Sequence, residues 1–253
     1  MLRVVVTGAS SGIGAALARL YAGRGAVLGL IARRQDSLAE LRSQLSVPVE
    51  IYAADVRDAR AMQAAAADFI ARRGCPHIVI ANAGISVGTA TAIDEDIAVF
   101  QDVLDVNVLG LVKTFQPFLA AMHAAGGGTL VGIASVAGYR GLPGSGAYSA
   151  SKAAAISYLE SLRVELRGSG IKVITICPGY VATPMTAKNP YPMPFILSAE
   201  SAALKIARAV AGGRAYSVIP WPMALVARLL RMMPRWLYDR IFDSVPRKPR
   251  RTH

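Results

Sequence analysis

Short runs of Val, Ile and Leu alternate along the chain with longer, alanine-rich amphipathic segments. The short runs are apolar throughout, which is typical of parallel strands covered by helices on both faces. We expect strands at 3–7, 27–32, 49–54, 77–82, 128–135, 172–177 and 216–220. The longer segments predict helices at about 12–23, 36–45, 58–72, 94–123, 148–167 and 199–211.

The regular alternation of strand and helix predicts an α/β fold. Strands joined through helices give a doubly wound parallel sheet, here of about seven strands with helices on both faces. Neither a repeat nor a linker divides the chain, so we expect a main domain over 1–220 and a C-terminal helical extension of it over 221–253. The uncharged segment 114–139 contains Pro117 and a Gly-Gly-Gly triplet, which favours a helix end, a turn and a buried strand over a membrane span.

Composition limits the class of protein further. Of the 253 residues, 53% are hydrophobic, which supplies a large core and excludes a disordered chain. Two cysteines cannot form a disulfide framework, and the first apolar run is too short for a signal peptide, so we expect a cytoplasmic protein. The three histidines lack the spacing of metal ligands, and Asp94, Glu95 and Asp96 are expected to begin a helix, so we expect no metal site.

Positive charge is concentrated towards the carboxyl end. Residues 214–253 contain nine Lys and Arg residues and two Asp residues, and so carry +7 of the net charge of +12. The sequence has no basic strand interleaved with aromatic residues, which argues against nucleic-acid binding. Within 221–251, Arg228, Arg231 and Arg235 recur at helical spacing beside apolar residues, as in helices that make a peripheral membrane contact. The alternative is that these helices cover the substrate entrance or join subunits.

A glycine-rich segment, VVVTGASSGIG, connects the first expected strand to the first helix. Gly8, Gly12 and Gly14 would let the backbone turn tightly and approach a pyrophosphate at the helix amino terminus, as in Rossmann-like dinucleotide folds. Such folds often place an acidic residue after the second strand, but this chain has Arg33 and Arg34 there. Guanidinium groups suit a ribose 2′-phosphate, which predicts NADP(H) in preference to NAD(H). The alternative is that both arginines are solvated at a strand end.

Tyr148 and Lys152 stand four residues apart in an expected helix and so lie side by side on one face. A phenol with its ordinary pKa of about 10 is a poor base at neutral pH. A positive charge about 4 Å away contributes about 4 kcal/mol at an effective dielectric of about 20, which is enough to lower a pKa by about 3 units. The pairing therefore predicts that Lys152 adapts Tyr148 to proton transfer.

These features together resemble the short-chain dehydrogenase/reductase family over nearly all of the expected main domain. The landmarks follow one another in the order of that family, which makes a chance match of one short motif unimportant. They are TGASSGIG (7–14), ADV (54–56), NAG (82–84), Asn107, Ser135, YSASK (148–152) and PGYVATPM (178–185). Many NADP-preferring members have a basic residue where this chain has Ser11, so the expected cofactor choice depends on Arg33 and Arg34.

The resemblance implies a role for each matching position. Tyr148 would be the general acid/base, Lys152 would lower its pKa and hold the nicotinamide ribose, and Ser135 would hydrogen-bond the substrate oxygen. Asn107 would anchor a water that links Lys152 to solvent, and Thr183 would bind the nicotinamide carboxamide. The other implied cofactor-binding positions are Gly8, Ser10, Ser11, Gly12, Ile13, Gly14, Arg33, Arg34, Asp55 near the adenine, Val56, Asn82, Ala83, Gly84, Pro178, Gly179 and Val181.

These expectations describe an oxidoreductase that transfers a hydride between NADP(H) and a carbonyl or alcohol. The segment 185–200 is apolar and would form a lid over a lipophilic small-molecule substrate, unless it packs as an ordinary loop. The alternative function is a non-catalytic nucleotide-binding or membrane-surface scaffold, against which the complete set of expected catalytic residues argues. The expected helices at 94–123 and 148–167 are rich in small and apolar residues. In members of the family that this chain resembles, the corresponding helices pair across a two-fold axis, so we expect a homodimer or homotetramer.

Overall fold

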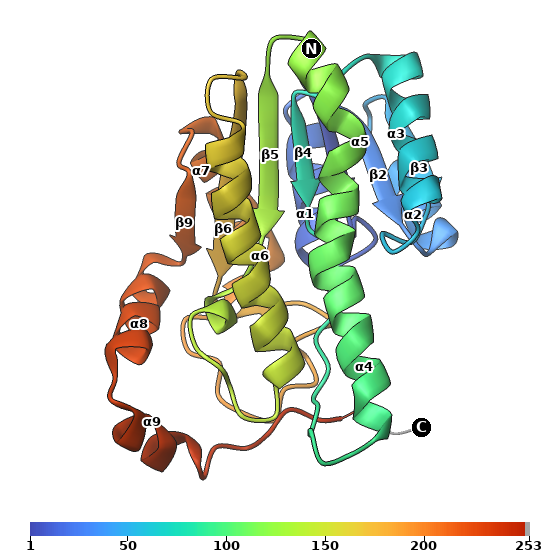
Figure 1. The fold of residues 1–253 in the computed structure, drawn as a ribbon. Helices are drawn as coiled ribbons and strands as arrows, with labels where there is room; N and C mark the ends of the chain where they lie inside the picture. The colour runs from blue at the N-terminus through green and yellow to red at the C-terminus, as the bar shows by residue number, and fades with distance from the viewer. Residues whose placement is uncertain (251–253) are drawn as a thin grey trace.

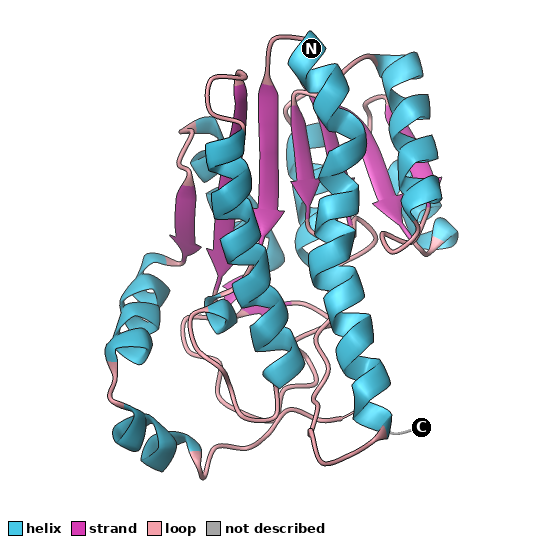
Figure 2. Ribbon diagram, in the orientation of Figure 1, coloured by secondary structure: helices cyan, strands magenta, loops and turns pink. Residues whose placement is uncertain are grey.

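A computed structural model describes residues 1–250 of the chain. Seven strands form one parallel sheet in the order β3-β2-β1-β4-β5-β6-β9 (Figures 1 and 2). They are β1 Arg3–Thr7, β2 Val27–Ala32, β3 Val49–Ala53, β4 Ile78–Ala81, β5 Gly128–Ile133, β6 Ile171–Pro178 and β9 Tyr216–Ile219. The doubly wound α/β fold predicted from the sequence is confirmed.

Helices cover both faces of this sheet. α1, α2 and α7 lie on one face, and α3, α4, α5 and α6 lie on the other (Figure 1). Their bounds are α1 Gly12–Ala22, α2 Gln35–Ser43, α3 Ala59–Arg73, α4 Glu95–Leu104, α5 Gly110–Ala124, α6 Gly146–Glu165 and α7 Ala199–Ala211. The sheet is therefore the middle of three layers, and ligands can reach it at the ends of its strands.

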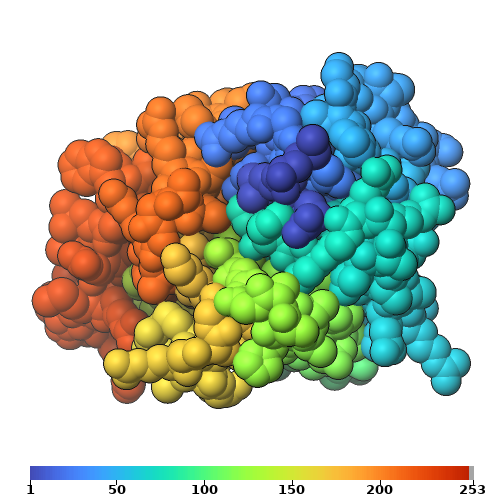
Figure 3. All heavy atoms as spheres, turned by 90° about the horizontal axis from the view of Figure 1, so that it is seen from above, coloured from blue at the N-terminus to red at the C-terminus, as the bar shows by residue number. Residues whose placement is uncertain are grey.

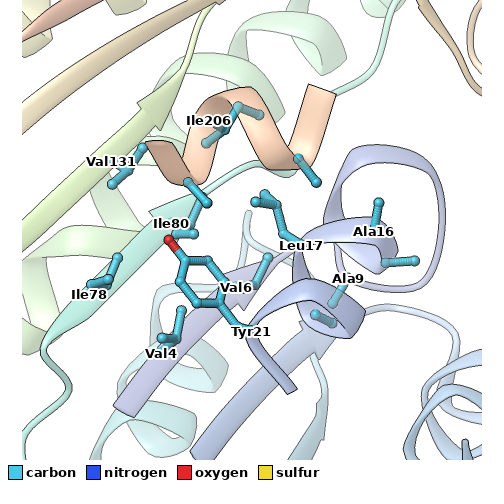
Figure 4. Close-up of a cluster of buried hydrophobic side chains, with 14 of the residues drawn as sticks. Val4, Val6, Ala9, Ala16, Leu17, Tyr21, Ile78, Ile80, Val131 and Ile206 are labelled. Carbon is cyan, nitrogen blue, oxygen red and sulfur yellow. The ribbon is translucent and has the colours of Figure 1, made fainter. Parts of the chain in front are cut away.

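The central strands bury side chains in both directions. Val4 and Val6 of β1 pack with Leu17 of α1 and Ile206 of α7 on one face (Figure 4). Val5, between them in the sequence, belongs to the cluster on the opposite face. All five side chains are buried. Because every position of such a strand meets a helix layer, the sequence reads as a continuous apolar run.

The structure divides one expected helix and begins another one residue earlier than expected. The single helix expected over 94–123 is instead α4, a π-helical turn at Asp105–Leu109, and α5. Such turns are frequent at functional sites, and this one carries Asn107. In α2, Arg34 is the N-cap, while Asp36, a residue type suited to capping, lies in the first turn, where its carboxylate faces the positive end of the helix dipole.

The C-terminal extension contains two helices, α8 (Trp221–Met232) and α9 (Arg235–Phe242), on the side of the molecule opposite the light-blue β3 edge (Figure 3). The loop between β5 and α6 holds them. Arg140 donates hydrogen bonds to the carbonyls of Leu230 (2.5 Å) and Met233 (2.6 Å), and the Tyr238 hydroxyl donates to the Gly141 carbonyl. Within the described residues, no helix is long and apolar enough to cross a membrane.

Candidate active site

One large cleft lies at the carboxyl ends of the strands. β1 and β4 are neighbours in the sheet although two strands separate them in the sequence, and doubly wound sheets bind ligands at this kind of switch point. All of the site residues expected from the sequence line the cleft, except Gly14 and Asn107. The expected residues that line it are Gly8, Ser10, Ser11, Gly12, Ile13, Arg33, Arg34, Asp55, Val56, Asn82, Ala83, Gly84, Ser135, Tyr148, Lys152, Pro178, Gly179, Val181 and Thr183.

The glycine loop between β1 and α1 has no room for side chains. Gly8 and Gly12 have φ angles of 65° and 54°, in the left-handed region that favours glycine. A Cβ on Gly14 would lie 2.3 Å from the Gly8 carbonyl oxygen, and one on Gly8 would lie 2.8 Å from the Ala83 Cα. The loop therefore exposes backbone N–H groups at the amino end of α1, which is a cradle for a phosphate anion.

Thr7, which sequence analysis did not assign to the site, ties this loop to β4. Its buried hydroxyl accepts hydrogen bonds from the backbone N–H groups of Asn82 (3.1 Å) and Ala83 (3.2 Å). The Asn82 side-chain amide returns a bond to the Thr7 carbonyl at 2.9 Å. A threonine ending a fully apolar strand was the available signal, because a buried hydroxyl needs a partner.

Two arginines lie where β2 ends. Arg33 and Arg34 are both exposed, and Arg34 Nη2 donates to Ser10 Oγ on the glycine loop at 3.2 Å. In the described part of the chain, neither arginine forms an ion pair with a carboxylate. Asp55, by contrast, pairs with Arg57 at 2.7 Å, and this hydrogen-bonded partner lowers the pKa of the Asp55 carboxyl. Both guanidinium groups beside the glycine loop can therefore accept an anionic ligand.

Ser135, Tyr148 and Lys152 meet where β5 ends and α6 begins. The buried Lys152 ammonium donates to the Ile133 carbonyl at 2.8 Å and lies 5.8 Å from the centroid of the Tyr148 ring. Ser135 Oγ accepts a hydrogen bond from the Ala137 N–H at 3.1 Å. A hydroxyl, a phenol and an ammonium thus share one corner of the cleft.

Burial controls the ionisation of these groups. It lowers the pKa of Lys152 to about 8, and it raises the pKa of Tyr148, with hydrogen bonding to Ser135 opposing the rise. The sequence pairing predicted that Lys152 would lower the pKa of Tyr148. In the protein alone, the cost of burying the phenolate raises this pKa instead, and the opposing contribution comes from Ser135 rather than from Lys152. Behind this corner, burial raises the pKa of the Cys177 thiol to about 11, so Cys177 is no thiolate nucleophile at neutral pH.

Asn107 does not line the cleft but supports its wall from behind. Its side-chain oxygen accepts from the Ile85 N–H at 2.8 Å, and its amide donates to the Ile85 carbonyl and to Ser151 Oγ, both at 2.9 Å. Ser151 in turn donates to the Tyr148 carbonyl at 2.8 Å. A Cβ on Gly84 would lie 3.2 Å from the Asn107 oxygen and 3.6 Å from Lys152 Nζ. Asn107 is therefore linked to the Tyr148 helix through Ser151, a residue that sequence analysis passed over.

The segment expected as a lid is closed at its base. β7 (Val181–Ala182) pairs with β8 (Leu197–Ser198), so the chain between them forms a loop beside the cleft. Met185 lines the cleft, whereas Phe195 and Ile196 are 52% and 44% exposed. Only part of the apolar lid surface therefore faces the cleft.

A nicotinamide dinucleotide fits the residues present. The glycine cradle can take the pyrophosphate, and the exposed arginines can take a further phosphate. Thr183 closes over the cradle, because a Cβ on Gly12 would lie 3.0 Å from its Cγ2. Among residues 1–250, no group of His, Cys, Asp and Glu could hold a metal ion. Hydroxyl and phenol groups beside a redox cofactor are suited to proton transfer coupled to hydride transfer.

Comparison with known proteins agrees with this geometry. Residues 3–192 match the family described as short chain dehydrogenase. The chain is 38% identical over 238 residues to an uncharacterized oxidoreductase of Myxococcus xanthus, a match that covers 93% of this chain and 94% of the relative. The chain belongs to the short-chain dehydrogenase family. It is therefore an oxidoreductase that acts on alcohol or carbonyl groups with a nicotinamide cofactor.

Other members of the short-chain dehydrogenase family match over most of the chain. Cis-4-hydroxycyclohexanecarboxylate dehydrogenase of Sinomonas cyclohexanicum is 36% identical over 210 residues, covering 81% of this chain and 83% of the relative. The crystal structure of L-sorbose reductase from Gluconobacter frateurii, complexed with NADPH and L-sorbose, superimposes with a TM-score of 0.76 at 26% identity. That match covers 86% of this chain and 94% of the reductase.

Proposed function

We propose that the protein is an NADP(H)-dependent reductase or dehydrogenase in which Tyr148 transfers the proton. The observation that carries this proposal is the convergence of Ser135, Tyr148 and Lys152 in one corner of the cleft, next to the glycine cradle. A protein that only bound nucleotide would need the cradle but not this corner. Asn107 has a positioning role, since it fixes the wall at Ile85 and the Tyr148 helix through Ser151.

In carbonyl reduction, Ser135 and Tyr148 hydrogen-bond the carbonyl oxygen and so orient the substrate. A nicotinamide held by the glycine cradle would supply the hydride. Tyr148 gives its proton to the oxygen as negative charge develops there. The Lys152 ammonium, held by the Ile133 carbonyl, stabilises the phenolate that remains. Alcohol oxidation uses the same groups in reverse, with Tyr148 as the base.

The preference for NADP(H) over NAD(H) is supported by the guanidinium groups of Arg33 and Arg34 beside the glycine loop, which form no ion pair within residues 1–250. No acidic residue stands at the end of β2 to bind a ribose hydroxyl or repel a 2′-phosphate. L-sorbose reductase, one of the structural neighbours, was crystallised with NADPH. One charge-assisted phosphate contact corresponds to about ten- to hundredfold in affinity.

A substrate with an apolar body is supported by Met185 and Ile85 in the cleft wall and by the apolar loop beside it. The relative from Sinomonas cyclohexanicum is named for a hydroxyl on a cyclohexane ring, which is an apolar body of this kind.

We place the protein in the cytoplasm, with the free thiols of Cys75 and Cys177 as support.

Two further proposals concern partners. A homodimer or homotetramer through α4, α5 and α6 is supported by exposed apolar side chains on these helices, among them Ile97 and Val164. A peripheral membrane contact through 221–250, with residue 251 of the expected segment outside the described residues, is supported by exposed Trp221 and Met232 on α8. The basic extension is also the feature that would favour the alternative function, a membrane-surface scaffold.

The experiment that tests the proposal is an NADPH-consumption screen over steroid, acyl-thioester, sugar and short-chain carbonyl compounds. We expect turnover of at least one carbonyl class by the wild-type protein and none by Tyr148→Phe. NADPH binding, measured by thermal shift on the same samples, provides a readout that does not depend on the substrate. Failure to bind either NADPH or NADH would contradict the proposed function directly.

A further inference from the structure

The chain after α9 crosses the carboxyl edge of the sheet and ends beside α4 (Figure 1). We call residues 243–250 the strap. The Gly88 N–H donates to the Pro249 carbonyl at 3.0 Å, and Gly88 forms a parallel bridge with Arg250. Arg250 pairs with the buried Asp96 through bonds of 2.6 and 3.1 Å. A Cβ on Gly88 would lie 2.2 Å from the Lys248 carbonyl oxygen, so this approach requires glycine.

The strap also contacts the loop that precedes the Tyr148 helix. Gly144 has a φ of 70°, and a Cβ there would lie 2.8 Å from the Arg247 Cβ. The Thr89 N–H joins the two supporting loops by donating to the Gly144 carbonyl at 3.1 Å. The strap is thus seated on both loops that flank Tyr148.

Lys248 is the strap residue that lies beside Tyr148. Its ammonium donates to Ser86 Oγ at 2.7 Å and lies 5.8 Å from the centroid of the Tyr148 ring. Ser86 follows Ile85, which lines the cleft. Lys248 and Lys152 are therefore equally far from the ring of Tyr148, but Lys152 comes from its own helix and Lys248 from the end of the chain.

Among the described residues 1–250, the Lys248 ammonium has no counter-charge. Within residues 1–250 it forms no ion pair, and its one hydrogen-bond partner is the neutral Ser86 hydroxyl. The side chain is half-buried, and this burial lowers its pKa. A partly desolvated cation without an anion is unfavourable, and the charges of the strap's other anchor, Arg250 and Asp96, already satisfy each other. An anionic ligand group would supply the missing partner.

We propose that Lys248, assisted by Ser86, binds an anionic group of the substrate, so that the enzyme acts on carbonyl or hydroxy compounds that carry a carboxylate or a similar anion on an apolar body. The proposal rests on the proposed function, because it takes Tyr148 as the position of the reacting oxygen. The alternative is that Lys248 only fastens the strap through Ser86. The two differ in one respect: a fastener affects all substrates alike, whereas an anion site discriminates by substrate charge.

A pair of aldehydes that differ only in charge separates these cases. We would measure kcat/KM with NADPH for 4-formylbenzoate and for its neutral methyl ester. The acid-to-ester ratio should fall about tenfold or more in Lys248→Met, since one charge-assisted bond is lost, and should be largely retained in Lys248→Arg. Lys205→Met, which removes an exposed cation on α7, is the matched control and should leave the ratio unchanged. An equal loss for both aldehydes in Lys248→Met would overturn the proposal.

A binding measurement keeps the inference separate from catalysis. Calorimetric titration of the NADP+-loaded protein with 4-methylbenzoate and with 4-methylbenzamide requires no turnover. Tighter binding of the carboxylate that is lost in Lys248→Met and in Lys248→Gln supports the anion site. Equal binding of acid and amide by wild-type protein refutes it, even if both aldehydes are reduced. If neither aldehyde is reduced and NADP+ does not bind, the proposed function is wrong. The same titration of the protein without cofactor then still tests whether Lys248 binds an anion.

Discussion

Lys152 lies beneath the ring of Tyr148, with its ammonium 5.8 Å from the ring centroid and 2.8 Å from the carbonyl oxygen of Ile133. The two residues are one turn apart in α6, which begins at Gly146. The Lys152 side chain therefore joins the strand that ends at Ile133 to the helix that carries Tyr148. The same side chain supplies the positive charge. A change at Lys152 alters both the position and the electrostatics of the corner.

Removing the Tyr148 hydroxyl should abolish proton transfer while leaving the cofactor site intact. We expect Tyr148→Phe to lower kcat by about 10²- to 10⁴-fold, the usual contribution of a positioned acid/base group. Thermal shift with NADPH should remain close to wild type, because the glycine cradle is unchanged. Ser135→Ala should be severe but less complete, since Tyr148 can still donate its proton. Activity retained by Tyr148→Phe on any substrate found in the screen would reject the mechanism.

The pH dependence of reduction should report Lys152. Burial lowers the pKa of its ammonium to about 8, so the group is charged below that pH and neutral above it. Burial raises the pKa of Tyr148, so the phenol keeps its proton over the same range. We therefore expect kcat/KM for carbonyl reduction to be level below about pH 8 and to fall above it, as the phenolate loses its stabilising charge.

The control for this profile is Lys152→Met, whose low residual activity should lack the limb near pH 8. The carbonyl compound used must itself have no ionisable group, so that the enzyme alone titrates. A falling limb at the same pH in the Lys152→Met variant would assign the titration to another residue.

The fold could be predicted because its central strands have no polar face. Val4, Val5 and Val6 are buried alternately on two faces, and this arrangement is visible as a continuous apolar run. The cleft residues could be grouped because they sit at the ends of successive strands, which meet at one edge of a parallel sheet. The catalytic and cofactor roles given to them remain predictions.

The strap and the pKa of Tyr148 could not be predicted in the same way. Lys248 lies beside Tyr148 because Gly88 and Asp96 hold the end of the chain. These contacts join residues about 150 positions apart and leave no local pattern. In the sequence Lys248 was one charge of a basic tail. The direction in which the pKa of Tyr148 shifts depends on how deeply packing buries the phenol. A spacing of four residues in the sequence does not reveal that burial.

Replacing Arg33 and Arg34 together should change the cofactor preference. We expect Arg33→Ser with Arg34→Ser to weaken NADPH binding by about ten- to hundredfold, because the charge-assisted contacts to the 2′-phosphate are lost. NADH binding should change little. Arg42→Ser, which removes an exposed arginine at the far end of α2, is the control. Titration of each variant with both nucleotides measures the effect, and equal or tighter NADH binding by wild-type protein would contradict the preference.

Assembly should depend on the surface formed by α4, α5 and α6, together with the π-helical turn between α4 and α5. Ile97, Leu109 and Val164 are 66%, 47% and 59% exposed, which is unusual for large apolar side chains unless another surface covers them. We expect light scattering to show a dimer or tetramer at micromolar concentration and Leu109→Glu with Val164→Glu to shift it towards monomer. Leu204→Glu, an exposed apolar position on α7 of the opposite layer, should leave assembly unchanged. A wild-type monomer would count against this interface.

The last prediction concerns the surface of α8. Trp221, Leu225, Leu229 and Met232 follow at helical spacing and are 77%, 57%, 56% and 80% exposed, while Met223 and Ala227 bury the opposite side of the helix. Exposed arginines at 228 and 231 lie on the same helix. Apolar side chains can enter the interface of a bilayer while each nearby arginine adds about 1 kcal/mol on anionic lipid. We expect the protein to co-sediment with anionic liposomes at low salt.

Removing the whole extension is a poor test of this contact, because a chain ending at Pro220 also loses Lys248 and the strap. Leu225→Ser with Leu229→Ser keeps the chain whole and should reduce co-sedimentation several-fold without changing NADPH binding. Leu204→Ser is the matched control on α7. Salt should weaken binding, since it screens the arginines but not the apolar insertion. If wild-type protein stays in the supernatant at low salt, or if the double variant sediments as well as wild type, the stripe on α8 does not bind membranes.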